Sequence, residues 1–188
     1  MRKPMFILVV SFLVATGPSL AVATDAIKGA FGMTLGEVLS KKDSRATATE
    51  RFSGDAGLRY TFTPDHPFGA LDEYRILVTP QTLVIYRIAA EGKFPSAARC
   101  EEELLALQEA LERKYDAFDD NVTDAMVNSL TGVKVIRFGH TPRRIVGTCV
   151  GIMGEHTLSL SYIADDLERR AKAEKARMGE GHYQGLGL

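Results

Sequence analysis

The chain has 188 residues, and its 23 lysines and arginines stand against 24 aspartates and glutamates, which gives a formal net charge of −1. A nearly neutral chain without a clustered basic run lacks the electrostatic signature of nucleic-acid binding. It also lacks the polybasic stretch that attracts a protein to an anionic membrane surface. We therefore expect no nucleic-acid partner.

Residues 1–23 have the three-part pattern of a cleaved secretory signal, with a positive start, an apolar run at 5–15 and small residues before the cut. We predict cleavage between Ala23 and Thr24. A membrane-spanning helix needs about 20 apolar residues, and Gly17-Pro18 interrupts this run. The mature chain is expected to be periplasmic or secreted, in a Gram-negative bacterium, without stable insertion into a membrane.

Gly29, Gly32 and Gly36 precede the first element that we predict. Their spacing matches neither a P-loop nor a dinucleotide-binding fingerprint, and no lysine follows the last of them. The stretch 34–37, TLGE, matches the capping box that marks the start of a helix. We therefore predict a short helix over 35–41, and no cofactor. The polar stretch that follows is predicted to be a loop or an irregular edge segment.

Three strands are predicted next, at 58–63, 73–79 and 82–90. The first two alternate between apolar and polar residues, as half-buried strands do, and the third is apolar on both faces. The side chains placed on the apolar face of the first two strands are Leu58, Tyr60, Phe62, Tyr74, Ile76 and Val78. Pro80-Gln81 is short enough to be a hairpin turn before the third.

Pro95-Ser96 opens the most regular helix pattern in the chain. Apolar residues recur at steps of three or four, and polar residues occupy the opposite side, so the helix is expected to cover a sheet. The apolar positions are Ala97, Cys100, Leu104, Leu107, Leu111 and Tyr115. Cys100 is therefore expected to point toward the sheet.

Three further strands are predicted at 133–138, 143–153 and 157–163, joined by short turns as a second antiparallel meander. In the last of them Leu158, Leu160 and Tyr162 alternate with serines, so these three side chains are expected to share one face. The acidic segment before them, 116–132, is ambiguous between a loop and a helical turn. A charged, alanine-rich helix follows the last strand.

The predicted order is helix, three strands, helix, three strands, helix. This order defines an α+β fold, with an antiparallel sheet of about six strands in two meanders, backed by the amphipathic helix. We expect a single domain over 24–163, a charged C-terminal helix over 164–178, and a disordered glycine-rich tail over 179–188.

The chain has two cysteines, Cys100 and Cys149. In an oxidising compartment an isolated pair most simply forms one disulfide, here joining the amphipathic helix to the second meander. Buried free thiols and a reactive thiol are the alternatives, and neither is favoured, because no C-x-x-C motif is present and the chain is predicted to be exported.

No catalytic or metal-binding motif is visible, and no nucleophile elbow of the form G-x-S-x-G occurs. The histidines lack the ligand spacing of a zinc site; they are His66, His140, His156 and His182. The carboxylate pairs Asp119-Asp120 and Asp165-Asp166 are interpreted as solvated loop acids and as helix-start acids. We assign no catalytic, cofactor-binding or metal-binding residue.

The stretch 31–39, FGMTLGEVL, resembles the start of small exported bacterial α+β domains of the SmpA and beta-lactamase-inhibitor-protein-like group. The matching residues are Gly32, Met33, Glu37 and Val38. The resemblance implies protein binding in the cell envelope, since those domains are associated with outer-membrane assembly or with inhibition of other proteins. This chain differs in lacking a lipobox cysteine and in adding a charged C-terminal helix.

We predict an exported, non-enzymatic protein that works through contact with another envelope or secreted protein, as an assembly factor or an inhibitor or immunity-type protein does. Two alternatives stay open. One is a periplasmic hydrolase with a dispersed active site that uses residues such as His66, His140 and the acids. The other is a small-ligand carrier that uses the sheet face bearing Tyr60 and Phe62.

Overall fold

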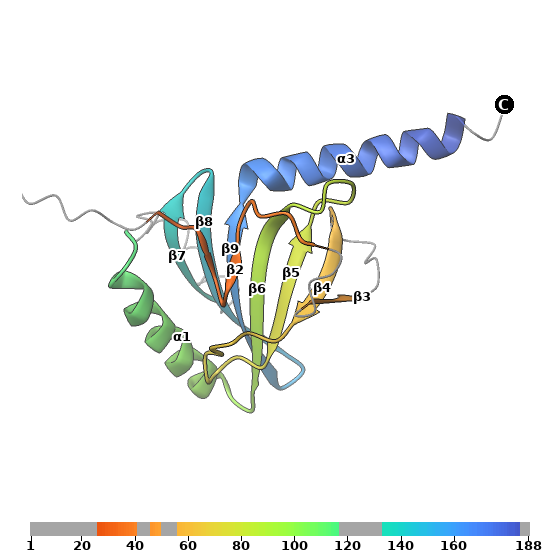
Figure 1. Cartoon of the computed structure of the whole chain (residues 1–188). Coiled ribbons are helices and arrows are strands. Elements are labelled where there is room, and N and C mark those ends of the chain that lie inside the picture. Colours follow the sequence, from red (N-terminus) through yellow and green to blue (C-terminus); the bar gives the residue numbers. More distant parts are fainter. Residues whose placement is uncertain (1–25, 41–45, 50–55, 117–132, 185–188) are drawn as a thin grey trace, which may run out of the picture.

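The computed structural model describes residues 26–40, 46–49, 56–116 and 133–184 (Figure 1). These residues form an α+β fold, as the sequence predicts. The predicted signal and its cleavage site at Ala23 and Thr24 lie outside the described residues, as do Asp119 and Asp120.

The sheet has seven antiparallel strands in the order β3-β4-β5-β6-β9-β8-β7. Six of them are the predicted ones: β4 Leu58–Phe62, β5 Glu73–Val78, β6 Ile85–Phe94, β7 Lys134–His140, β8 Arg143–Ile152 and β9 Glu155–Ala164. The seventh, β3 Ala46–Thr49, pairs with β4 at the edge, within the stretch expected to be a loop or an irregular edge segment. The two meanders join where β6 pairs with β9, from Arg87 opposite Ile163 to Phe94 opposite His156.

The main hydrophobic core lies on one face of this sheet. Successive side chains of a strand point to opposite faces, so alternate residues along the strands contribute to this core. The buried side chains on this face include Tyr74, Ile76, Ile88, Ile136, Phe138, Ile145, Cys149, Leu158, Leu160 and Tyr162. The predicted alternation within β4, β5 and β9 is confirmed, since Leu58, Tyr60 and Phe62 contact the same cluster.

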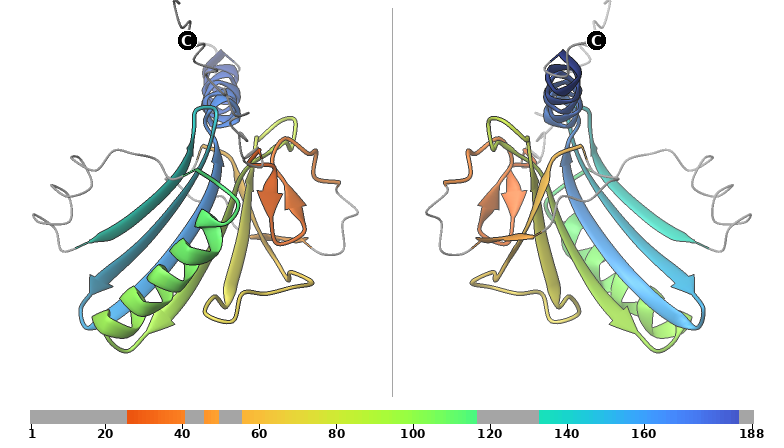
Figure 2. Two further views of the ribbon diagram at one scale, coloured as in Figure 1. Left: turned by 90° about the vertical axis from the view of Figure 1, so that its left-hand side faces the viewer. Right: turned by 90° about the vertical axis from the view of Figure 1, so that its right-hand side faces the viewer.

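The helix α1, Ala97–Glu112, covers the half of this face formed by β6, β9, β8 and β7 (Figure 2). Ser96 caps it, because its hydroxyl accepts a hydrogen bond from the Arg99 N–H at 3.3 Å. The buried residues of the helix are Cys100, Leu104, Leu107 and Leu111, four of the predicted apolar positions. The Sγ atoms of Cys100 and Cys149 lie at disulfide distance, 2.05 Å, so the predicted pairing is confirmed.

The predicted helix over 35–41 is wrong for its described part, 35–40. A hairpin forms first, from β1 Gly29–Ala30 and β2 Met33–Thr34. The chain then runs extended beside the start of β6: the Gly36 N–H donates to the Ile85 carbonyl, and the Ile85 N–H donates to the Glu37 carbonyl, both at 2.8 Å. Met33, Leu35 and Leu39 are buried there and cover the β5–β6 half of the core face.

The second helix, α3 Asp165–Gln184, follows β9 without a loop and lies across one end of the sheet (Figure 1). Its Leu167 and Ala171 pack with Leu77 and Tyr86 in a small second cluster. The helix continues past 178, where the sequence predicts a disordered tail to begin. The rest of that tail, 185–188, lies outside the described residues.

Candidate functional site

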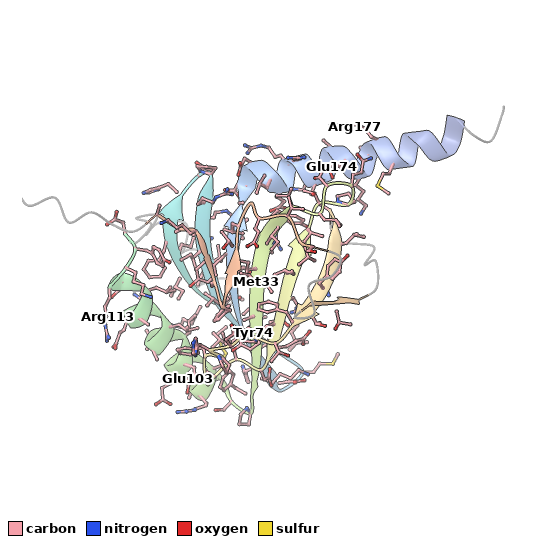
Figure 3. All side chains as sticks on the ribbon, in the orientation of Figure 1. Met33, Tyr74, Glu103, Arg113, Glu174 and Arg177 are labelled. Carbon is pink, nitrogen blue, oxygen red and sulfur yellow. A yellow bond between two sulfur atoms is a disulfide. The ribbon has the colours of Figure 1, made fainter. Side chains whose placement is uncertain are left out.

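Glu174 ties α3 to the turn between β5 and β6, and it is buried, with 3% of its surface exposed. One carboxylate oxygen accepts hydrogen bonds from the backbone N–H groups of Gln81, at 2.9 Å, and Thr82, at 3.3 Å. The other accepts from the Thr82 hydroxyl at 2.8 Å and from Arg170 Nε at 3.0 Å. Figure 3 shows Glu174 where α3 passes over this turn. The buried carboxylate is therefore satisfied by four donors.

Two acidic residues of α3 have lowered pKa values. Burial by itself raises the pKa of Glu174, but hydrogen bonds from Gln81, Thr82 and Arg170 outweigh it, and the net pKa is below the ordinary value. The pKa of Glu168 is lowered in the same way: burial opposes ionisation, and Lys172 and Arg87 outweigh it. Both carboxylates thus hold α3 in place as anions.

The start of α3 is held by a second set of charges, on the β7–β8 hairpin. Arg143 Nη1 donates to Asp166 Oδ1 at 3.1 Å, and Arg144 Nε donates to Asp165 Oδ1 at 2.9 Å. Successive strand residues point to opposite faces of a sheet, so the two arginines hold the helix from both sides. Asp165 and Asp166, predicted to be helix-start acids, are also ion-pair partners.

Beyond Glu174 the same helix leaves the body of the protein (Figure 1). Leu167, Ala171 and Glu174 form the side of α3 that faces the sheet, and Met178 continues this stripe by one helical step. Met178 is nevertheless 39% exposed, and Ala176 and Arg177 are exposed too. This projecting part of α3, from Lys175 onward, is a candidate docking surface.

A cleft of about 350 Å³ lies at the β7–β8 hairpin, beside the start of α3. His140 and Asp165, two of the residues considered for a dispersed active site, both line it. The Asp165 carboxylate, however, accepts two hydrogen bonds from Arg144. The cleft is lined by no serine or cysteine; its residues are Arg137, Phe138, Gly139, His140, Thr141, Arg144, Ile145, Val146 and Asp165. It therefore offers a histidine, a threonine hydroxyl, two arginines and an ion-paired carboxylate, but no serine or cysteine nucleophile.

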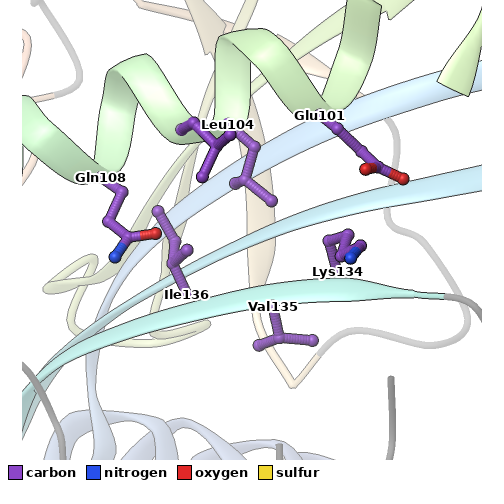
Figure 4. Close-up of a pocket in the computed structure, with 7 residues that line it drawn as sticks. Glu101, Leu104, Gln108, Lys134, Val135 and Ile136 are labelled. Carbon is purple, nitrogen blue, oxygen red and sulfur yellow. The ribbon is translucent and has the colours of Figure 1, made fainter. Parts of the chain in front are cut away.

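A second depression, of about 220 Å³, separates α1 from the edge strand β7 (Figure 4). Leu104 and Ile136 give it an apolar floor, and Glu101, Gln108 and Lys134 border it. Most small-molecule sites are larger, at about 300–1,000 Å³, and have convergent polar groups. We interpret this depression as a gap at the edge of the helix–sheet packing.

Among the described side chains, the other histidines considered for catalysis or metal binding do not gather at one site. His66 is exposed in the loop between β4 and β5, and His156 lies on β9. His66 lines neither the cleft nor the depression. Within the described ranges, no three histidine, cysteine or acidic side chains gather as a metal site would require.

The aromatic residues weighed as a binding platform belong to the core. Phe62 and Tyr74 are buried and pack edge to face, with ring centroids 5.9 Å apart. Phe31, from the N-terminal hairpin, covers Tyr74 at 5.0 Å. Phe62 is therefore part of the core, and Tyr60 is partly buried against the same cluster.

Comparison of the chain with protein-family models, with curated proteins and with solved structures finds no significant match. The resemblance to SmpA and beta-lactamase-inhibitor-protein-like domains therefore stays a prediction. In the described part of the chain, no helix is long and apolar enough to cross a bilayer.

Proposed function

We propose that this protein is exported, has no catalytic activity, and works by contact with another envelope or secreted protein. The observation that carries the proposal is the division of α3 into a docked half, which ends at Glu174, and a half that projects past the sheet. The envelope-assembly and inhibitor roles implied by the resemblance both belong to this class.

The projecting part of α3 lacks the packing that stabilises most helices. It continues the docked half, so it needs no new helix nucleus, but most helical stability in proteins comes from tertiary packing. Its exposed residues include Met178 on the continued stripe. A partner that covers this stripe would supply the missing packing, as grooves do for amphipathic helices.

Export is supported by the cysteine pair. Disulfides persist in oxidising compartments and are rare in the cytosol, and Cys100 and Cys149 lie at bonding distance with both residues buried. Expression of the whole chain in a bacterial host, followed by mass spectrometry, tests the export proposal. We expect a mature N-terminus at Thr24 and a periplasmic or secreted product; an uncleaved cytosolic chain would contradict it.

Site-specific photo-crosslinking tests the contact itself. A photoreactive residue at Met178 is expected to give a protein adduct, whereas one at Ala173, exposed on the docked half, gives at least about tenfold less. A chain that ends after Ala176 keeps the Glu174 anchor, so its stability should change by less than about 0.5 kcal/mol. When this shortened chain is added unlabelled and in excess, it should nevertheless fail to reduce the adduct formed by the label at position 178. Equal adducts at both positions, or full competition by the shortened chain, would reject the proposal.

The hydrolase alternative has one observation in its favour, which is that His140 and Asp165 line the same cleft. If it holds, the purified protein hydrolyses members of an ester, amide and glycoside panel, and His140→Ala removes that activity. No turnover favours the non-enzymatic proposal, whereas turnover that His140→Ala leaves unchanged would exclude this cleft as the active site.

A further inference from the structure

The turn between β8 and β9 places an apolar residue in an unfavourable backbone conformation. Ile152 pairs with Glu155, so Met153 and Gly154 form a two-residue loop. Their φ angles are +51° and +87°. Two positive φ values in succession are the requirement of a type I′ turn, for which Asn-Gly and Gly-Gly are favoured. Methionine has a Cβ that disfavours this region, so its presence here is unfavourable for folding.

Two other non-glycine residues in the described chain have positive φ, and in both cases packing offsets the strain. Phe31 stacks edge to face on Tyr74 and Tyr162, with centroids 5.0 and 6.3 Å away. Leu83 packs against the same core. Met153 differs, because its side chain is fully exposed at 104%, and the neighbouring Ile152 is 68% exposed. Neither conformation nor burial therefore favours an apolar residue at position 153.

Residues in strained backbone conformations cluster at functional sites, and contiguous exposed apolar patches mark interaction sites. We propose that Ile152 and Met153 form an apolar contact tip that inserts into an apolar pocket on a partner protein. The proposal rests on the protein-contact function above and adds a second surface, away from α3, at the opposite end of the sheet (Figure 1).

The charges around the tip favour a protein pocket over a lipid surface. Glu155, the one acidic or basic residue in the hairpin segment 151–155, forms an ion pair with Lys93 on β6 at 2.8 Å. The tip therefore carries no net charge. Attraction to an anionic bilayer requires clustered lysines or arginines, whereas the centre of a protein interface is depleted of charge and often contains methionine.

The test is a photoreactive residue at position 153 in the full chain, irradiated in an extract of the cells that make the protein. The same label at Leu105 serves as a control, since Leu105 is an apolar residue of similar exposure to Ile152, at 59%, on α1. Three unlabelled chains are added as competitors: the wild type, Leu105→Gln, and the double variant that combines Ile152→Thr with Met153→Asn. Asparagine suits a positive φ better than methionine does, so the double variant should unfold at the same temperature as wild type or higher.

The proposal predicts a protein adduct at position 153 and none at position 105. Wild type and Leu105→Gln should compete equally, and the double variant at least about tenfold less well. Lipid adducts, adducts to a second copy of this chain, no adduct, or equal competition by the double variant would each overturn it. An adduct at Met178 without one at position 153 rejects the tip alone, whereas no adduct at either position rejects the proposed function as well.

Discussion

The Glu174 carboxylate accepts a hydrogen bond from the Gln81 N–H at 2.9 Å, across 93 residues of sequence. This contact joins the helix at the end of the chain to the turn of the first meander. Around it, α3 has little apolar contact with the body, mainly through Leu167 and Ala171. The position of the helix therefore depends on hydrogen bonds and ion pairs.

Glu174→Gln should weaken the docking of α3. An amide retains the volume but can accept on one oxygen only, and its NH₂ group would face existing donors. We expect a loss of about 1–3 kcal/mol in unfolding free energy, measured by urea denaturation, with faster hydrogen exchange in α3. The exposed Glu109→Gln is the matched control and should stay within about 0.5 kcal/mol of wild type. Equal effects of the two substitutions would rule out the anchor.

The two buried or partly buried carboxylates of α3 make the free energy of unfolding depend on pH. The pKa values of Glu174 and Glu168 are lower in the folded chain than the ordinary value of 4.5. Their stabilisation is therefore complete above about pH 4.5 and is lost as the pH falls through the lower, folded values. The difference in unfolding free energy between wild type and Glu174→Gln should be largest near pH 7 and shrink below about pH 4. A difference independent of pH would contradict this explanation.

The ion pair between Arg144 and Asp165 should show measurable coupling. Both side chains are partly exposed, so solvent screening keeps the expected energy near 0.5–1 kcal/mol. A double-mutant cycle with Arg144→Gln and Asp165→Asn measures it by thermal or urea unfolding. The coupling should fall as salt is raised. Strict additivity of the two substitutions at low salt would show that the pair contributes nothing.

Removal of the disulfide should destabilise the chain substantially. The bridge spans 49 residues between α1 and β8, and the chain-entropy model gives a stabilisation of about 4 kcal/mol for a loop of that size. Cys100→Ala with Cys149→Ala should therefore lower the urea midpoint. Wild type unfolded in reductant provides the comparison and should lose a similar amount. If neither treatment moves the midpoint, the bridge is not a source of stability.

Several elements could be predicted from the sequence because their signals are local. Alternation over 73–79 and 157–163 placed the buried faces of β5 and β9, and the steps of three and four after Ser96 placed the buried side of α1. The pairing of Cys100 with Cys149 followed from their number and the expected compartment. Glu174 and Met153 gave no such signal, since a glutamate in a charged helix and a methionine in a turn are ordinary in sequence.

The helix predicted over 35–41 shows that a local sequence pattern can be outweighed by tertiary packing. The capping-box pattern at 34–37 contributes at most about 2 kcal/mol to a helix start. The extended alternative buries Met33, Leu35 and Leu39 and forms backbone hydrogen bonds with β6, and burial of each such side chain contributes about 1.5–3 kcal/mol. The sequence by itself determined the class of fold, the strand faces and the disulfide, because periodicity and composition act over a few residues. Only the tertiary structure decided the path of the N-terminal segment, the anchoring of α3 and the exposure of Met153, because each depends on groups that lie far apart in the chain.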